Sequence, residues 1–89
     1  TEVALHNAYP NPFNPTTMIE YELPEDMFVN LSIYDIRGRL VTELVNEMQS
    51  ASFSAHQVTW NAKTQASGVY FIRLVAGNTI EHQKIMLIK

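Results

Sequence analysis

The side chains of this chain that could do metal or acid–base chemistry are its three histidines and nine acidic residues. A zinc site needs several ligands at close and regular spacing, whereas His6, His56 and His82 lie far apart in the sequence. Glu20 and Glu22 fall on one face of a predicted strand and could act as a carboxylate pair. Two solvated positions on the outside of a strand explain them better. The sequence therefore predicts no metal site and no acid–base pair.

Calcium, phosphate and nucleophile sites have no better support. Asp26 and Asp35 each stand alone in a predicted turn, whereas a calcium loop needs several oxygen ligands at close spacing. The chain has no glycine-rich phosphate loop. Ser67 precedes Gly68 in a strand-entry turn and not in a nucleophile elbow. We therefore expect no enzymatic activity and no cofactor.

Composition narrows the class of protein further. The 89 residues suffice for a single domain over 1–89, and a hydrophobic content of 46% is typical of a folded chain. Without cysteine, no disulfide framework can form. A net charge of −3 with only six Lys and Arg argues against nucleic-acid binding, and no apolar run approaches the ~18 residues of a membrane span. Because the chain starts at Thr1 and shows no signal peptide, we expect it to be a piece of a longer protein.

The clearest strand signal is the run GVYFIRLVA that starts at Gly68. Tyr70, Ile72 and Leu74 fall on one face and the residues between them fall on the other, which is the period of a β-strand. Gly68 tolerates positive φ at the entry of the strand. Tyr70 stands where Ig-like sandwiches place a tyrosine corner, whose hydroxyl bonds to backbone a few residues upstream. A Gly-Asn step then closes the strand and predicts a tight hairpin.

Shorter apolar–polar alternations before and after this run predict six more strands. Asp35 to Gly38 reads as a type I turn with glycine in the left-handed position, within a bulged hairpin. Residues 46–55, which include Met48 and Phe53, are predicted to form a loop. The predicted strands span residues 1–8, 16–23, 28–35, 39–45, 56–61, 70–76 and 80–89. Seven short strands without a helix of normal length predict an all-β fold, an Ig-like antiparallel β-sandwich.

The two faces of these strands have different expected roles. Phe28, Tyr34 and Phe71 fall on the outward phase, where a flat row of aromatic rings could stack on sugar rings. We favour the interpretation that these rings cover one another, or that a loop or a neighbouring domain covers them. On the inward phase, one core cluster is predicted from Ile19, Tyr21, Leu31, Ile33, Trp60, Tyr70 and Ile72.

A proline-rich segment, YPNPFNP at residues 9–15, interrupts the strand pattern. Its three prolines remove three backbone donors and keep the preceding residues extended, so the segment cannot lie inside a sheet. We expect Tyr9 and Phe13 to anchor it to the end of the sandwich as a structural latch. Asn11 is expected to bond local backbone. A proline-rich ligand for a partner domain is the alternative.

Four segments together resemble the C-terminal sorting domain of type IX secretion cargo, which is an Ig-like family. They are YPNPFNPTT from Tyr9, LSIYDIRGR from Leu31, VTWN from Val58, and ASGVYF from Ala66 with KIMLIK at the chain end. The Ig-like domain of flagellar hook-capping proteins looks similar. Residues 51–56 lack the glycine that the family commonly has, so nothing is carried over there. The residues that match the family motifs are Tyr9, Pro10, Asn11, Pro12, Phe13, Asp35, Gly38, Trp60, Gly68 and Tyr70.

The resemblance implies a non-enzymatic C-terminal secretion signal. Such a domain directs an N-terminal cargo domain through an outer-membrane translocon of a Gram-negative bacterium, by way of the periplasm, to secretion or to the cell surface, where processing machinery acts on it. The residues that the resemblance assigns to translocon recognition are Lys84, Ile85, Met86, Leu87, Ile88 and Lys89. A terminal strand can bury one face and still offer its edge to another chain, so we expect this strand to do both. The alternatives are an accessory module of a secreted enzyme, including one that binds carbohydrate, and a structural domain of the hook-capping type.

Overall fold

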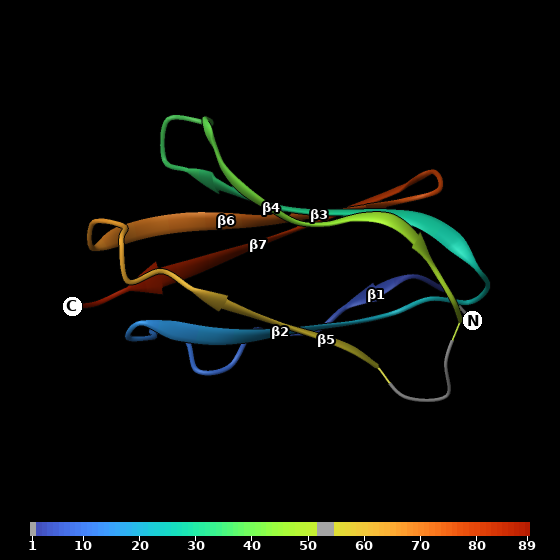
Figure 1. Cartoon of the computed structure of the whole chain (residues 1–89), viewed down its shortest axis with the longest axis horizontal. Coiled ribbons are helices and arrows are strands. Elements are labelled where there is room, and N and C mark those ends of the chain that lie inside the picture. The colour runs from blue at the N-terminus through green and yellow to red at the C-terminus, as the bar shows by residue number, and fades with distance from the viewer. Residues whose placement is uncertain (1, 52–54) are drawn as a thin grey trace.

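Two antiparallel β-sheets face each other across one hydrophobic core in the computed structural model, which describes residues 2–51 and 55–89 (Figure 1). One sheet has the strand order β1-β2-β5 and the other the order β4-β3-β6-β7. The strands are β1 (Ala4–Leu5), β2 (Thr16–Glu22), β3 (Met27–Asp35), β4 (Leu40–Gln49), β5 (His56–Asn61), β6 (Gly68–Ala76) and β7 (Thr79–Leu87). The predicted all-β sandwich is confirmed.

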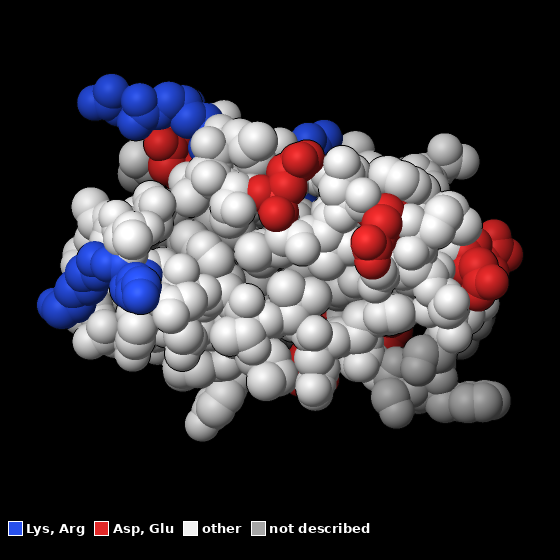
Figure 2. All heavy atoms as spheres, in the orientation of Figure 1, with Lys and Arg blue, Asp and Glu red and all other residues white. Residues whose placement is uncertain are grey.

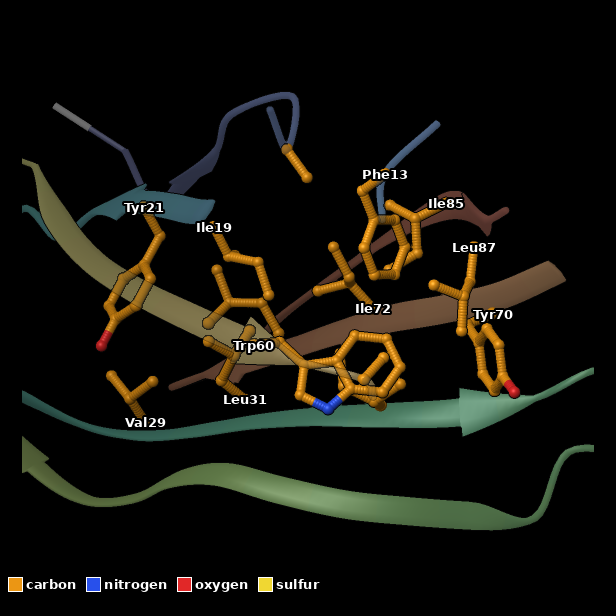
Figure 3. Close-up of a cluster of buried hydrophobic side chains, with 14 of the residues drawn as sticks. Phe13, Ile19, Tyr21, Val29, Leu31, Trp60, Tyr70, Ile72, Ile85 and Leu87 are labelled. Carbon is orange, nitrogen blue, oxygen red and sulfur yellow. The ribbon is translucent and has the colours of Figure 1, made fainter. Parts of the chain in front are cut away.

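The core lies between the sheets and is built from the inward phase of each strand. All seven residues of the predicted cluster are buried, as are Val29, Leu74 and Ile85. Trp60 sits among aromatic neighbours, with its ring centroid 5.6 Å from that of Phe13 and 5.4 Å from that of Tyr70 (Figure 3). Burying a large apolar side chain contributes about 1.5–3 kcal/mol, so this cluster is the main source of stability.

The strand limits differ most from the prediction at β1, β4 and β7, and by one or two residues at β2, β3 and β6. β4 continues to Gln49 because it stays paired with β3 as far as Met27, so Met48 lies in a strand and not in a loop. Phe53 lies outside the described residues. β1 is reduced to two residues, and β7 ends at Leu87 because its last partner, Gly68, is the first residue of β6.

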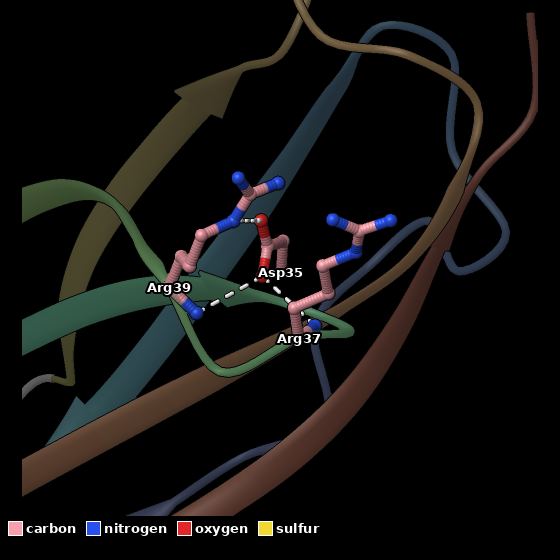
Figure 4. A network of polar contacts seen from close by, with 3 residues as sticks. All are labelled: Asp35, Arg37 and Arg39. Carbon is pink, nitrogen blue, oxygen red and sulfur yellow. Dashed lines mark hydrogen bonds and ion pairs between the residues drawn. The ribbon is translucent and has the colours of Figure 1, made fainter.

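The tight turn between β3 and β4 forms as predicted (Figure 4). Gly38 donates its N–H to the Asp35 carbonyl at 3.0 Å and adopts φ +82°, a conformation that glycine tolerates without strain. One carboxylate oxygen of Asp35 accepts hydrogen bonds from the N–H groups of Arg37 and Arg39, and the other accepts one from Arg39 Nε. These contacts, above all the Arg39 N–H, lower the pKa of the Asp35 carboxyl below its ordinary value.

The entry of β6 also follows the sequence interpretation. Tyr70 donates its hydroxyl to the Ala66 carbonyl at 2.6 Å, which is the bond expected of a tyrosine corner. Gly68 adopts φ +152° at the start of the strand. Together these residues fix the corner from which β6 crosses the centre of its sheet.

Candidate functional site

The C-terminal strand β7, which carries most of the predicted recognition residues, is the last strand of the four-stranded sheet. Its side chains alternate between the core and the surface. Ile85 and Leu87 are only 1% exposed and face the core, whereas Met86 is 40% exposed and Ile88 50% exposed. Lys84 and Lys89 are also exposed. The predicted set therefore divides into two structural residues and four surface residues.

The chain end beyond the strand is tied to the loop before β6. Lys89 lies beyond the last residue of β7 that pairs with β6. Its N–H donates to Ser67 Oγ at 3.1 Å, and its Nζ donates to the Lys63 carbonyl at 2.6 Å. Ile88 continues the line of β7 without pairing to β6. The last two residues are thus held in place while their side chains remain exposed.

The outer edge of β7 is covered by the proline-rich segment. Phe13 donates its N–H to the Met86 carbonyl at 2.9 Å, and Ile88 donates its N–H to the Phe13 carbonyl at 3.0 Å. The Asn11 amide adds two more bonds, from its Nδ2 to the Lys84 carbonyl at 3.2 Å and from the Met86 N–H to its Oδ1 at 3.0 Å. The edge from Lys84 to Ile88 is therefore closed, which differs from the accessible edge expected from the sequence.

The same segment is fastened to the opposite sheet. Tyr9 exchanges two backbone hydrogen bonds with Met18 in β2, at 3.0 and 2.9 Å, and Thr17 Oγ1 donates to the Pro10 carbonyl at 2.8 Å. Phe13 is buried and anchors the segment as predicted, but the Tyr9 side chain is 80% exposed. The expectation for Tyr9 was wrong because its backbone, and not its ring, makes the attachment. The segment thus links β2 to β7 across the side of the sandwich.

Asn11 and Gln83 are two polar residues that bond the N-terminal segment to β7, a role that the sequence did not reveal. Asn11 bonds to β7, far away in the sequence, and not to local backbone as expected. Gln83 accepts the Ala8 N–H at Oε1 (2.6 Å) and donates from Nε2 to the His6 carbonyl at 2.8 Å. Its place on the same phase of β7 as the buried Ile85 and Leu87 was the one available signal.

The opposite edge of this sheet, strand β4, is open among the described residues. The Asp35 N–H donates to the Arg39 carbonyl. The backbone N–H and C=O groups of Asp35, and of every second residue before it in β3, are therefore directed toward β4. Val29 has this orientation and faces Glu47, so the neighbours of Glu47, Asn46 and Met48, direct their backbone groups outward. Leu40 and Met48 are more than half exposed.

The outward aromatic residues separate into two groups. Tyr34 and Phe71 are cross-strand partners on β3 and β6, and both line a groove of about 280 Å³ on the outer face of the sheet. Phe28 lies six residues away along β3 and does not line this groove. The three rings therefore do not form the single row considered from the sequence. Arg73 and His82, which also line the groove, face each other on β6 and β7.

The residues considered for metal or acid–base chemistry lie apart. His6 contacts Glu22, and His56 stacks on Tyr21 with ring centroids 5.0 Å apart. Glu20 accepts a hydrogen bond from Gln57. Within residues 2–51 and 55–89, no three His, Asp or Glu side chains gather as metal ligands. The pKa of Tyr21, whose ring stacks on His56, is raised by burial and by the Glu47 charge.

Comparison with known proteins supports the fold and the family. The crystal structure of CopC from Methylosinus trichosporium OB3b is similar, with a TM-score of 0.54 and 17% identity over 97% of this chain and 91% of that chain. At this identity the likeness shows the fold alone. Curated proteins give no match. The described part of the chain contains no helix able to cross a membrane.

A family model settles the assignment. The model described as the secretion system C-terminal sorting domain matches residues 7–89, which is nearly the whole chain. The match includes the segment that covers the β7 edge and the chain end itself. This family comprises sorting signals and not enzymes. The chain therefore belongs to the family of secretion system C-terminal sorting domains, the signals that direct proteins into the type IX secretion system.

Proposed function

We propose that the secretion machinery recognises this domain through the side chains that the closed edge of β7 leaves on the surface. These are Lys84, Met86, Ile88 and Lys89, all exposed at one end of the sandwich. The observation that carries the proposal is the closure itself. The backbone of β7 is already bonded to Asn11 and Phe13 where the signal is expected, so the side chains are what a partner can reach.

Recognition by strand addition is less favourable at this place. A partner strand needs free N–H and C=O groups on the edge that it joins. Met86 has both groups bonded on its outer side to the proline-rich segment, whose Phe13 side chain is buried in the core. A partner strand that displaced this segment would also pull Phe13 out of the core. Exposing a phenylalanine that is 2% exposed costs about 1.5–3 kcal/mol in lost burial alone. A partner that reads side chains avoids this cost.

Membership in the family supports a wider role, which is part of the same proposal. The domain directs an N-terminal cargo protein from the periplasm of a Gram-negative bacterium through an outer-membrane translocon. The cargo is then secreted or held at the cell surface, and processing machinery removes the domain. Recognition of a folded sandwich is consistent with a core that extends through both sheets and includes the signal strand itself.

A surface-delivery assay tests the proposal. A reporter fused ahead of residue 1 is expressed in a type IX-competent host, and its amount on the surface and in the periplasm is measured. The paired substitution Met86→Ser and Ile88→Ser should leave the reporter in the periplasm. The matched control is Ile80→Ser, since Ile80 is 50% exposed and lies on the same outward phase of β7, away from the covered edge. This control should be delivered like the parent domain.

Folding is checked separately, because a misfolded signal would also fail. Changes at exposed positions usually alter stability by less than about 0.5 kcal/mol, so both variants should unfold at nearly the same denaturant concentration as the parent domain. Charge reversal at Lys84 and Lys89 should also reduce delivery, although Lys89→Glu loses its bond to the Lys63 carbonyl. Normal delivery of a folded Met86→Ser, Ile88→Ser variant would contradict the proposal.

A further inference from the structure

The groove on the outer face of the four-stranded sheet has an aromatic floor. Tyr34 and Phe71 face each other across β3 and β6, so their side chains are neighbours on the sheet surface. Ile36, in the turn after β3, adds an apolar wall and is 73% exposed. The groove measures about 280 Å³ and is open to solvent, which fits a ligand of one or two small rings.

Basic side chains lie beside this floor on a protein whose net charge is −3. Arg73 and His82 line the groove, and Lys84 is the cross-strand partner of Phe71. Among the described residues, neither Arg73 nor His82 takes part in an ion pair. Arg37 and Arg39 belong to the adjacent turn. Figure 2, which views the sandwich from its side, shows most of the visible Lys and Arg toward one end of the molecule.

The acidic lining residue does not cancel this charge. Asp35 lies at the groove, but its carboxylate is bonded to Arg39 and to the N–H groups of the turn. A lowered pKa for Asp35 reflects the same contacts. Arg73 is therefore the lining side chain that remains free to bind an incoming anion.

We propose that this groove binds an acidic sugar, a pyranose ring that carries a carboxylate. The apolar face of the sugar ring would pack on the aromatic rings of Phe71 and Tyr34. The carboxylate would accept hydrogen bonds from the Arg73 guanidinium, whose planar fork matches a carboxylate in a two-bond geometry. His82, which faces Arg73, lies where it can donate a further bond.

An acidic peptide fits the groove less well. β3 and β6 are the inner strands of the sheet, so their backbone groups are bonded on both sides and none is offered to a ligand at the floor. Extended peptides are usually bound through such backbone groups. A sugar ring needs only the side chains that the groove supplies. None of the residues that line the groove belongs to the covered edge of β7, although Lys84 of that edge lies beside Phe71. The inference goes beyond the sorting role.

Titration of the isotope-labelled domain with two sugars tests the proposal. D-galacturonate and D-galactose differ at the carboxylate, and tri-glutamate supplies carboxylates without a ring. Galacturonate should shift the NMR signals of Phe71, Tyr34 and Arg73 and bind at least about tenfold more tightly than galactose, the factor expected for one charge-assisted hydrogen bond. Tri-glutamate should bind at least about tenfold more weakly than galacturonate. Saturable binding of galacturonate with this order would support the proposal.

Three substitutions locate the binding site. Arg73→Gln should remove the preference for galacturonate over galactose. Phe71→Leu should weaken the binding of both sugars. Phe28→Leu is the matched control, because Phe28 is an exposed aromatic residue of the same sheet outside the groove, and it should change neither. Backbone spectra show whether each variant keeps the fold. No binding of galacturonate, equal binding of tri-glutamate, or binding that survives both groove substitutions would overturn the proposal.

Discussion

The two edges of the four-stranded sheet differ in whether their outward backbone N–H and C=O groups are hydrogen-bonded to another segment. On one side, β7 has the proline-rich segment bonded along Lys84 to Ile88, with Phe13 buried in the core behind it. On the other side, β4 has ten residues and no partner strand on its outer side among the described residues. The strand expected to carry the signal is thus the one whose edge is closed.

Closure of the β7 edge has a clear physical reason. An open edge strand presents unpaired N–H and C=O groups and is a template for pairing with other chains. β7 exposes Met86 and Ile88, so an open edge here would combine apolar side chains with free backbone. β4 instead carries Glu43 and Glu47, and charges of this kind discourage edge pairing. One edge is thus protected by a covering segment and the other by charge.

The largest expected difference between the two edges is in stability. Phe13→Ala should lower the free energy of unfolding by about 3–5 kcal/mol, because it empties a buried site beside Trp60 and loosens the cover of β7. Met48→Ala, on the open edge, should change it by less than about 0.5 kcal/mol, because Met48 is 61% exposed. Chemical denaturation measures both. Similar losses for the two variants would mean that the edges are equivalent.

A smaller effect is expected from the side-chain amides. Asn11→Ala removes two hydrogen bonds to β7 and should cost about 1–2 kcal/mol. Asn46→Ala, on β4, removes a single exposed bond from Asn30 at 3.3 Å and should cost less than about 0.5 kcal/mol. Chemical denaturation of the two variants, as above, measures both losses. If Asn11→Ala were as mild as Asn46→Ala, the amide would not hold the cover in place.

The smallest effect concerns pH and the turn that leads into β4. The pKa of Asp35 is lower in the folded domain than its unfolded value of about 4, so its bonds stabilise the fold above that pH. This stability is lost as the pH falls through the lower, folded pKa. The unfolding free energies of the parent and of Asp35→Asn should differ above about pH 5 and converge in acid. A constant difference down to pH 2 would show that the carboxylate charge is not involved.

The sequence predicted the strands and the core well because both depend on local alternation. Ile19, Leu31 and Ile72 face inward because period-2 alternation decides which face of a strand is apolar. The Asp35 to Gly38 turn and the Tyr70 corner also follow from residues that are close in the sequence. Each of these features could be inferred without knowing which strands are neighbours.

The parts of the site that could not be predicted depend on contacts between distant segments. Asn11 meets Lys84 and Met86 across more than seventy residues, and no local pattern specifies that pairing. The groove likewise requires the register that places Phe71 beside Tyr34 and Arg73 beside His82. The sequence placed Tyr34 and Phe71 on the outward phase but could not show which residues meet there.

Amide hydrogen exchange, followed residue by residue, tests most directly whether the edge of β7, the strand proposed to carry the signal, is closed. The Met86 and Ile88 amides are bonded to Asn11 and Phe13, and they should exchange as slowly as amides paired within the sheet. The Asn46 and Met48 amides point outward from β4 and should exchange at close to the rate of an unstructured chain. Rapid exchange at Met86 and Ile88, equal to that at Asn46 and Met48, would contradict a closed edge and favour recognition by strand addition.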